Sequence, residues 1–197
     1  MTDTTLRTLD LGCGPSPRSL DGALAYGVDV SGYLPAAAGI TPAPGVYWCD
    51  LAQGPLPFPD DFFVRVFAHD VLEHVPAVLY DQDNWRPDGA GAMRLGLRRR
   101  HCHVELFNEV WRVLRPGCVF EVEVPVLSPL NLAAAVGDPT HCSLWTANSF
   151  NYFCCGPDNF EYAWMRRYGY RAAFQRLSER HVHGGGHLRV EMRAVKG

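Results

Sequence analysis

The sequence lacks the features that direct a chain into or across a membrane. Its first residues, Met1 to Thr5, contain no basic segment followed by an apolar one, and no apolar run approaches the roughly twenty residues that span a bilayer. We therefore expect a cytoplasmic protein that has no membrane partner.

An excess of positive charge is also missing. The chain has 18 Lys and Arg against 21 Asp and Glu, a formal net charge of −3. Duplex nucleic acid is bound through a basic surface, so this balance gives no electrostatic reason to expect such a partner. The seven cysteines include no Cys-x-x-Cys pair, and we interpret them as reduced thiols in a reducing compartment.

What the sequence does contain begins with a short apolar segment and a glycine turn. Leu6–Leu11 has little helical period, which is typical of a strand buried on both faces of a parallel sheet. Gly12 and Gly14 follow at once and let the backbone turn sharply beside a ligand. With Ser16 as its N-cap, Pro17–Leu24 is predicted to be a helix. A strand, a glycine turn and a helix indicate a nucleotide site in an α/β sheet.

Acidic residues at the ends of the first three predicted strands narrow the choice of ligand. The third glycine of a dinucleotide motif would fall at position 17, which is Pro17. Asp29 ends the second strand, where a carboxylate can accept both ribose hydroxyls, and Asp50 follows the third, placed to meet an adenine amino group. Together with Asp10, these acids favour a cationic ligand without phosphate, such as S-adenosylmethionine.

Five motifs in order resemble the signature of class I S-adenosylmethionine-dependent methyltransferases, in particular small, single-domain proteins of methyltransferase type 11. They are Leu9-Asp10-Leu11-Gly12-Cys13-Gly14, Gly27-Val28-Asp29-Val30, Asp50-Leu51, Asp70-Val71-Leu72-Glu73-His74 and Leu114-Arg115-Pro116-Gly117. The resemblance implies an α/β, Rossmann-like fold: a seven-stranded, mostly parallel sheet with an antiparallel last strand and helices on both faces. The N-terminal helices that usually cap this fold are not expected here.

The resemblance also implies S-adenosyl-L-methionine as the cofactor. The predicted cofactor-binding residues are Asp10, Gly12, Cys13, Gly14, Asp29, Val30, Asp50, Leu51 and His69.

The remaining pattern fits one domain over residues 1–197, with insertions at about 81–101 and 127–170 beside the substrate site. We read the arginine triplet 98–100 as part of a solvated loop, with binding of an anionic substrate as the alternative. Further strands are predicted at 25–30, 46–49, 62–68, 119–124, 172–182 and 187–195, and helices at 69–80, 103–114, 145–153 and 160–168, with a short one within 31–45.

Methyl transfer is an in-line displacement, so alignment supplies much of the catalysis, and a base is needed when the acceptor is a protonated hydroxyl. Histidine titrates near neutral pH, which makes His141 or His69 the candidate base, with Asp70 beside them. We interpret His74 as structural. The pairs His101/His103 and His181/His183 are expected to be exposed and without function.

A metal-assisted alternative rests on Asp70-x-x-Glu73-His74. This motif resembles the Glu-x-x-Glu-His motif of small-RNA 2′-O-methyltransferases and ubiquinone-pathway O-methyltransferases, in which two carboxylates and a histidine hold a divalent ion. Here the first Glu is Asp, and His141 could supply another ligand. The prediction assigns no metal.

Three functions therefore compete. The first is methyl transfer to oxygen or nitrogen of a small-molecule, sugar or peptide-like acceptor. The second is metal-assisted 2′-O-methylation of RNA ribose, and the third is a non-catalytic, cofactor-binding scaffold subunit. Intact Gly12, Gly14 and Asp29 argue against the scaffold, and base methylation is disfavoured because neither Asn/Asp-Pro-Pro-Tyr nor Pro-Cys follows the fourth strand.

Charged side chains alternate with apolar ones on three strands expected to be neighbours. Because unpaired buried charges are costly, we expect cross-strand ion pairs on a face that is wet or covered by a second subunit, as in a homodimer. The residues are Arg65, Glu121, Glu123, Arg189, Glu191 and Arg193.

Overall fold

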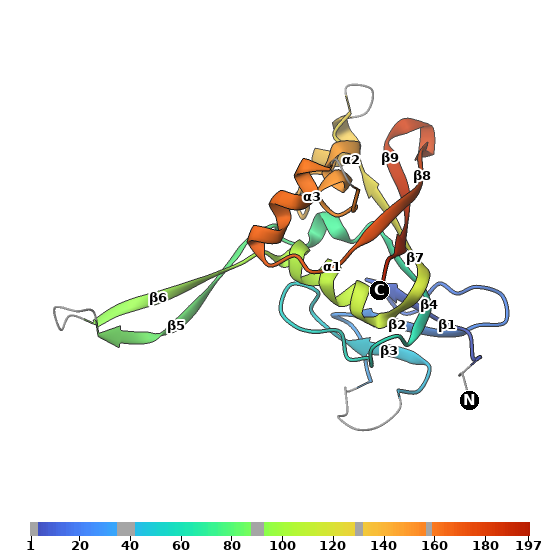
Figure 1. Ribbon diagram of the computed structural model, residues 1–197, viewed down its shortest axis with the longest axis horizontal. Coiled ribbons are helices and arrows are strands. Elements are labelled where there is room, and N and C mark those ends of the chain that lie inside the picture. Colours follow the sequence, from blue (N-terminus) through green and yellow to red (C-terminus); the bar gives the residue numbers. More distant parts are fainter. Residues whose placement is uncertain (1–3, 35–41, 88–92, 129–131, 157–158) are drawn as a thin grey trace.

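The computed structural model describes residues 4–34, 42–87, 93–128, 132–156 and 159–197. A seven-stranded sheet in the order β3-β2-β1-β4-β7-β9-β8 forms the body, and β5 and β6 form a separate two-stranded sheet (Figure 1). The seven strands are β1 Arg7–Leu11, β2 Leu24–Asp29, β3 Gly45–Trp48, β4 Phe63–His69, β7 Leu114–Pro125, β8 Phe174–Val182 and β9 His187–Ala194.

The strand directions confirm the predicted sheet. Strands β3, β2, β1, β4 and β7 run parallel, and the last strand, β9, runs antiparallel to both β7 and β8. The buried apolar runs account for this arrangement, because Leu9 and Leu11 of β1 are fully buried between β2 and β4. The parallel strands therefore end at one edge, where the glycine turn and the predicted acidic residues also lie.

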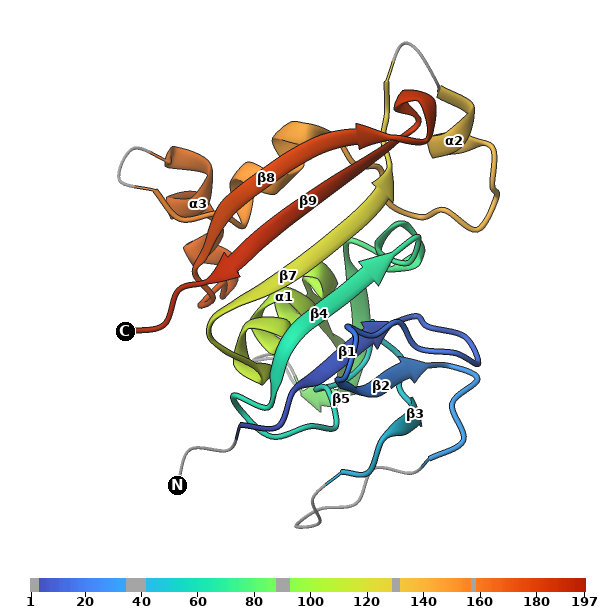
Figure 2. The same ribbon diagram turned by 90° about the vertical axis from the view of Figure 1, so that its right-hand side faces the viewer.

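Helices α1 (Cys102–Val113) and α3 (Phe160–Met165) lie on one face of the sheet, and the helices predicted for the other face are not found among the described residues (Figure 2). The predicted helix at 103–114 is α1, and it buries Phe107 against β7, where the Phe107 and Phe120 rings lie 5.3 Å apart. In Figure 2, α1 and α3 lie behind the sheet, and no described helix lies in front of β1, β4, β7 or β9. The shorter segments are α2 Leu132–Val136, η2 Ala147–Tyr152, α3 Phe160–Met165 and η3 Arg166–Tyr168, which include the helices predicted at 145–153 and 160–168.

The predicted helix Pro17–Leu24 does not form. Arg18 donates its backbone N–H to Asp10 Oδ2 over 2.8 Å, instead of to a carbonyl of a preceding helical turn. Pro17 has no N–H to donate, and Gly22 takes a left-handed φ of 74°. The segment between Gly14 and β2 is therefore a loop that lies on the front face of β1 and β2.

The predicted helix 69–80 is also wrong. Only one 3₁₀ turn, η1 Leu72–His74, follows β4. Val75 is extended, with φ −84° and ψ 123°, and it precedes Pro76, which disfavours helical backbone at the residue before it. The chain then enters β5, Leu79–Pro87, which pairs with β6, Met93–Arg100.

The antiparallel pair of β5 and β6 projects from the body of the molecule (Figure 1). These two strands include most of the residues of the insertion predicted at 81–101, and the arginine triplet 98–100 lies in β6 instead of in the predicted loop. The short helix expected within 31–45 falls largely on residues 35–41, outside the described residues. Among the described residues, no helix is long and apolar enough to cross a membrane.

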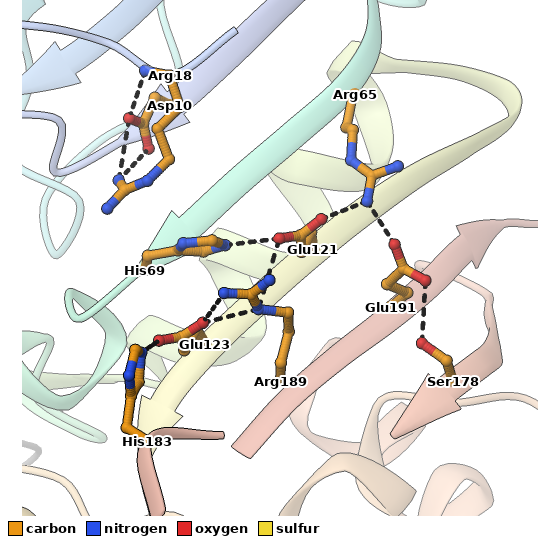
Figure 3. Close-up of polar contacts among 10 residues, drawn as sticks. All are labelled: Asp10, Arg18, Arg65, His69, Glu121, Glu123, Ser178, His183, Arg189 and Glu191. Carbon is orange, nitrogen blue, oxygen red and sulfur yellow. Dashed lines mark hydrogen bonds and ion pairs between the residues drawn. The ribbon is translucent and has the colours of Figure 1, made fainter. Parts of the chain in front are cut away.

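The other face of the sheet, in front of which no described helix lies, carries the predicted charges, and they pair across strands (Figure 3). Arg65 of β4 bonds both Glu121 of β7 and Glu191 of β9, and His69 Nε2 lies 2.9 Å from Glu121 Oε1. Arg189 Nε donates to Glu123 Oε2 over 2.7 Å. We call Arg65, His69, Glu121, Glu123, Arg189 and Glu191 the ion-pair ladder, and Arg193 is exposed beyond it.

The ladder holds its carboxylates ionised. The hydrogen bond from His69, together with Arg65, lowers the pKa of Glu121 to about 2 despite its burial. Burial raises the pKa of Glu123, but hydrogen bonds from Arg189 and His183 outweigh it and the net shift is downward. These carboxylates stabilise the folded chain through their charged form.

We expect Arg65→Met to destabilise the fold. Removing one partner of a buried ion pair costs about 3–5 kcal/mol, and the partial exposure of Arg65 reduces the expected loss to about 2 kcal/mol. Because the pKa of Glu121 is depressed, its contribution is complete above the ordinary pKa of 4.5 and is lost as pH falls toward about 2. Urea unfolding at pH 7 and pH 3 measures both effects. Arg193→Met is the control, and an equal loss there would contradict the role given to the ladder.

Candidate functional site

A cavity of about 170 Å³ lies where β1, β2 and β3 end and η1 begins. Five predicted cofactor residues meet around it, although they come from three separate loops. The lining residues are Gly12, Asp29, Val30, Cys49, Asp50, Leu51, Val71, His74 and Val75. The topology of the parallel sheet produces this meeting, because the carboxyl ends of neighbouring strands share one edge.

The glycine turn has a different constraint at each glycine. Gly12 has φ 64°, and a Cβ there would lie 2.3 Å from Val71 Cγ2, so only glycine fits beneath η1. Gly14 has φ 57°, and nothing lies within 4 Å of the point to which its Cβ would project. A ligand can therefore approach the backbone closely at Gly14.

Asp29 is held as a fixed carboxylate at the end of β2. Its Oδ2 accepts the Gly14 N–H over 2.9 Å, and its Oδ1 accepts both the backbone N–H (2.8 Å) and the hydroxyl (2.6 Å) of Ser31. Burial raises the pKa of Asp29, but these hydrogen bonds outweigh it and lower the pKa overall. Asp50 is oriented similarly, since its Oδ1 accepts the Ala52 N–H over 2.9 Å.

Four predicted cofactor residues do not line the cavity: Asp10, Cys13, Gly14 and His69. Asp10 is fully buried, and its carboxylate bonds the backbone and guanidinium of Arg18 (Figure 3). Cys13 packs its sulfur against Gly27, where a Cβ would come within 2.3 Å of it. Burial raises the pKa of Cys13 to about 12, so its thiol stays protonated. Asp10 and Cys13 shape the glycine loop from the front face of the sheet.

His69 is likewise held away from the cavity. It is the last residue of β4, its side chain is 10% exposed, and Nε2 is bonded to Glu121 in the ladder. His141, the other predicted base, lies close to η1, with Nε2 4.0 Å from Glu73 Oε1. The two candidate bases therefore belong to separate clusters.

Comparison with known proteins identifies the fold of this chain. No protein-family model and no curated protein matches the chain. Among solved structures, an S-adenosylmethionine-dependent methyltransferase from Mesorhizobium loti aligns over 96% of this chain and 91% of its own, with a TM-score of 0.50 and 15% identity. The 1,6-didemethyltoxoflavin-N1-methyltransferase from Burkholderia thailandensis aligns over 98% and 72%, with a TM-score of 0.51 and 13% identity. The chain has the methyltransferase fold.

The methyltransferase fold does not by itself fix the reaction, because one fold can host several activities. The [4+2]-cyclase SpnF aligns over 99% of this chain and 77% of its own, with a TM-score of 0.51 and 16% identity. The chemistry must therefore be argued from the side chains at the open edge of the sheet.

Asp70 lies at this edge, directly after β4 of the methyltransferase fold. It has a left-handed φ of 52°, and its Oδ1 lies 3.1 Å from His187 Nε2. The His187 ring is also 5.2 Å from that of His183, whose Nε2 lies 2.7 Å from Glu123 Oε1. The prediction that His183 is exposed is confirmed, but its place beside His187 was not predicted, because only the antiparallel pairing that sets His187 opposite Pro125 brings the two rings here.

A second histidine cluster surrounds η1. Glu73 is 1% exposed, and burial raises its pKa to about 7. The loop after α2 folds back onto η1, since Cys142 and Ser143 both donate their N–H to the Glu73 carbonyl, over 2.8 and 3.0 Å. This contact sets His141 beside Glu73 and His74. The prediction that His103 is exposed is wrong, because the His103 ring is buried against Trp145.

Proposed function

We propose that this chain is an S-adenosylmethionine-dependent methyltransferase acting on an oxygen or nitrogen of a small-molecule, sugar or peptide-like acceptor. The observation that carries the proposal is the Asp29 carboxylate, held ionised at the cavity between Gly14 and Ser31. The Burkholderia thailandensis methyltransferase with this fold was solved with S-adenosylhomocysteine bound, which supports the choice of cofactor.

The cavity residues fit the parts of this cofactor. Asp29 would accept the ribose hydroxyls, Asp50 would accept the adenine amino group, and Val30 and Leu51 would pack on the apolar ring. The open space at Gly14 admits a ligand against the backbone. When bound, the cofactor supplies a methyl group on a sulfonium, and the chain's part is to align the acceptor with it and exclude water.

Two measurements test the proposal. Titration calorimetry with S-adenosylhomocysteine should show one site per chain. Transfer of labelled methyl groups should then appear in at least one of four pools: metabolites, glycans, peptides and RNA. Binding without transfer in any pool would favour the scaffold function, and transfer confined to RNA would favour ribose methylation.

For the partner, we propose that a second copy of this chain covers the ion-pair ladder. Both charge signs occur on this face, and Arg189 and Glu191 are each partly exposed, so two copies related by a two-fold axis can bring opposite charges together. Light scattering should report a dimer that Arg193→Glu weakens, since this exposed residue flanks the ladder. Arg171→Glu, which lies outside the ladder, is the matched control, and a monomer at all concentrations would refute the proposal.

A further inference from the structure

The cluster around η1 brings together three side chains of the types that bind metal ions. Glu73 and His74 are adjacent in η1, and His141 comes from a loop more than sixty residues later. One ligand atom from each residue lies within 4.8 Å of the others. The His74 and His141 rings meet edge to face, with centroids 4.8 Å apart.

Glu73 is the member of the cluster that requires a partner. Its side chain is almost fully buried, and its Oε2 has no hydrogen-bond partner among the described residues. Buried carboxylate oxygens are nearly always bonded, because leaving one unpaired costs free energy. The orphaned oxygen belongs to the carboxylate whose Oε1 faces His141 Nε2 at 4.0 Å.

Both histidines are oriented through Nδ1. His141 Nδ1 lies 3.0 Å from the Ala135 carbonyl oxygen, so it carries the proton and donates it. His74 Nδ1 lies 3.0 Å from Thr140 Oγ1, whose own hydroxyl donates to Asp138 Oδ1 over 2.6 Å. Nδ1 of His74 is therefore also the donor. In each ring Nε2 keeps its lone pair, which is the arrangement that metal-binding histidines have in proteins.

We propose that Glu73, His74 and His141 bind one divalent transition-metal ion, with Zn²⁺ as the best match. Two imidazole nitrogens and one carboxylate, with a fourth position left open, form a known ligand set of catalytic zinc. Imidazole ligands favour zinc over magnesium. Ligand bonds of about 2.0–2.1 Å place tetrahedral ligand atoms roughly 3.3 Å apart, so small side-chain rotations close the cluster around the ion.

Asp70 is not part of this site. Its Oδ1 lies 3.1 Å from His187 Nε2. The sequence spacing that joins Asp70 to Glu73 and His74 therefore does not describe the cluster that forms in three dimensions.

The position of the site gives the ion a role that rests on the proposed function. His74 also lines the cavity that holds Asp29 and Asp50, so an ion held by this cluster would lie beside the proposed cofactor site. There it can bind an acceptor hydroxyl, lower its pKa and orient it toward the methyl group. An oxygen acceptor is then favoured over nitrogen.

Zinc binding by the full chain tests the site without any methyl-transfer assay. After treatment with EDTA, the protein should take up one equivalent of Zn²⁺ in competition with a chromophoric chelator. Changes beside metal ligands cost about 10–100-fold in affinity, so Glu73→Gln and His141→Ala, which remove direct ligands, should lose more than about 100-fold. His181→Ala, an exposed histidine, and Asp70→Ala should bind as the unchanged chain does.

Two further measurements distinguish loss of the metal site from loss of the fold. Circular dichroism confirms that each variant is folded, and Co²⁺ in place of Zn²⁺ should give the visible absorption of a four-coordinate site that His141→Ala abolishes. The inference would be overturned if the chain bound no stoichiometric Zn²⁺. It would also be overturned if Glu73→Gln and His141→Ala bound Zn²⁺ with the affinity of the unchanged chain. S-adenosylhomocysteine binding to the metal-free chain is measured separately, so that loss of the zinc site and failure of the methyltransferase proposal are told apart.

Discussion

Replacing Asp29 with alanine is expected to abolish measurable binding of S-adenosylhomocysteine while the chain stays folded. The carboxylate is the proposed acceptor for both ribose hydroxyls, and each hydrogen bond to a charged group contributes about 1.5–3 kcal/mol. Losing two such bonds lowers the affinity by at least about 100-fold. Calorimetry measures the affinity, and thermal unfolding shows whether the fold persists.

Two matched variants sharpen this experiment. Asp29→Asn keeps the shape of the side chain and removes its charge, so it should fall between alanine and the unchanged chain. Asp21→Ala removes an exposed carboxylate from the preceding loop and should bind normally. Unchanged affinity in Asp29→Ala would remove this residue from the cofactor site.

His141→Ala is expected to lower kcat by about 100- to 10,000-fold, the usual effect of losing a general base, with little change in cofactor affinity. A residue that aligns or activates the acceptor acts after the cofactor has bound, so the loss appears in turnover. Single-turnover methyl transfer and calorimetry separate the two quantities. His181→Ala serves as the control, and wild-type turnover in His141→Ala between pH 6 and pH 9 would exclude the residue from catalysis.

The same assay distinguishes the two roles considered for His141. If His141 is a base, the unchanged chain reacts fully in excess EDTA. If it is a metal ligand, EDTA abolishes turnover in the unchanged chain and added Zn²⁺ restores it. The Nδ1 contact with the Ala135 carbonyl and the orphaned oxygen of Glu73 favour the second result.

The sheet could be predicted because each strand is encoded by a short, contiguous segment of the sequence. Strands such as β1 and β4 are short apolar runs, and their order follows from the resemblance carried by the motifs at their ends. The helix expected at 17–24 could not be excluded from the sequence. The interaction that replaces its backbone hydrogen bonds is the bond from the Arg18 N–H to Asp10, and this bond forms only when the loop lies on β1. The prediction of a helix at 69–80 did not take Pro76 into account. The sequence alone shows that this proline disfavours helical backbone at Val75.

The site was predictable in part for the same reason. Asp29 and Asp50 follow strands directly, so the sheet alone places them at one cavity. The position of His141 beside Glu73 depends on the long loop after β7, and that of His187 beside Asp70 depends on an antiparallel register. Neither pairing has a spacing that could be read along the chain.

The ion-pair ladder has a consequence for how copies of this chain meet. A sheet of this fold that lacks helices on one face normally exposes apolar side chains there. Such a surface must be covered by an obligate partner. Here carboxylates and guanidiniums form ion pairs within each copy. The face of a separated subunit can therefore be exposed to water without an exposed apolar surface. Any pairing through this face should therefore be reversible, with an equilibrium set by concentration and loosened by salt, and each subunit should survive on its own.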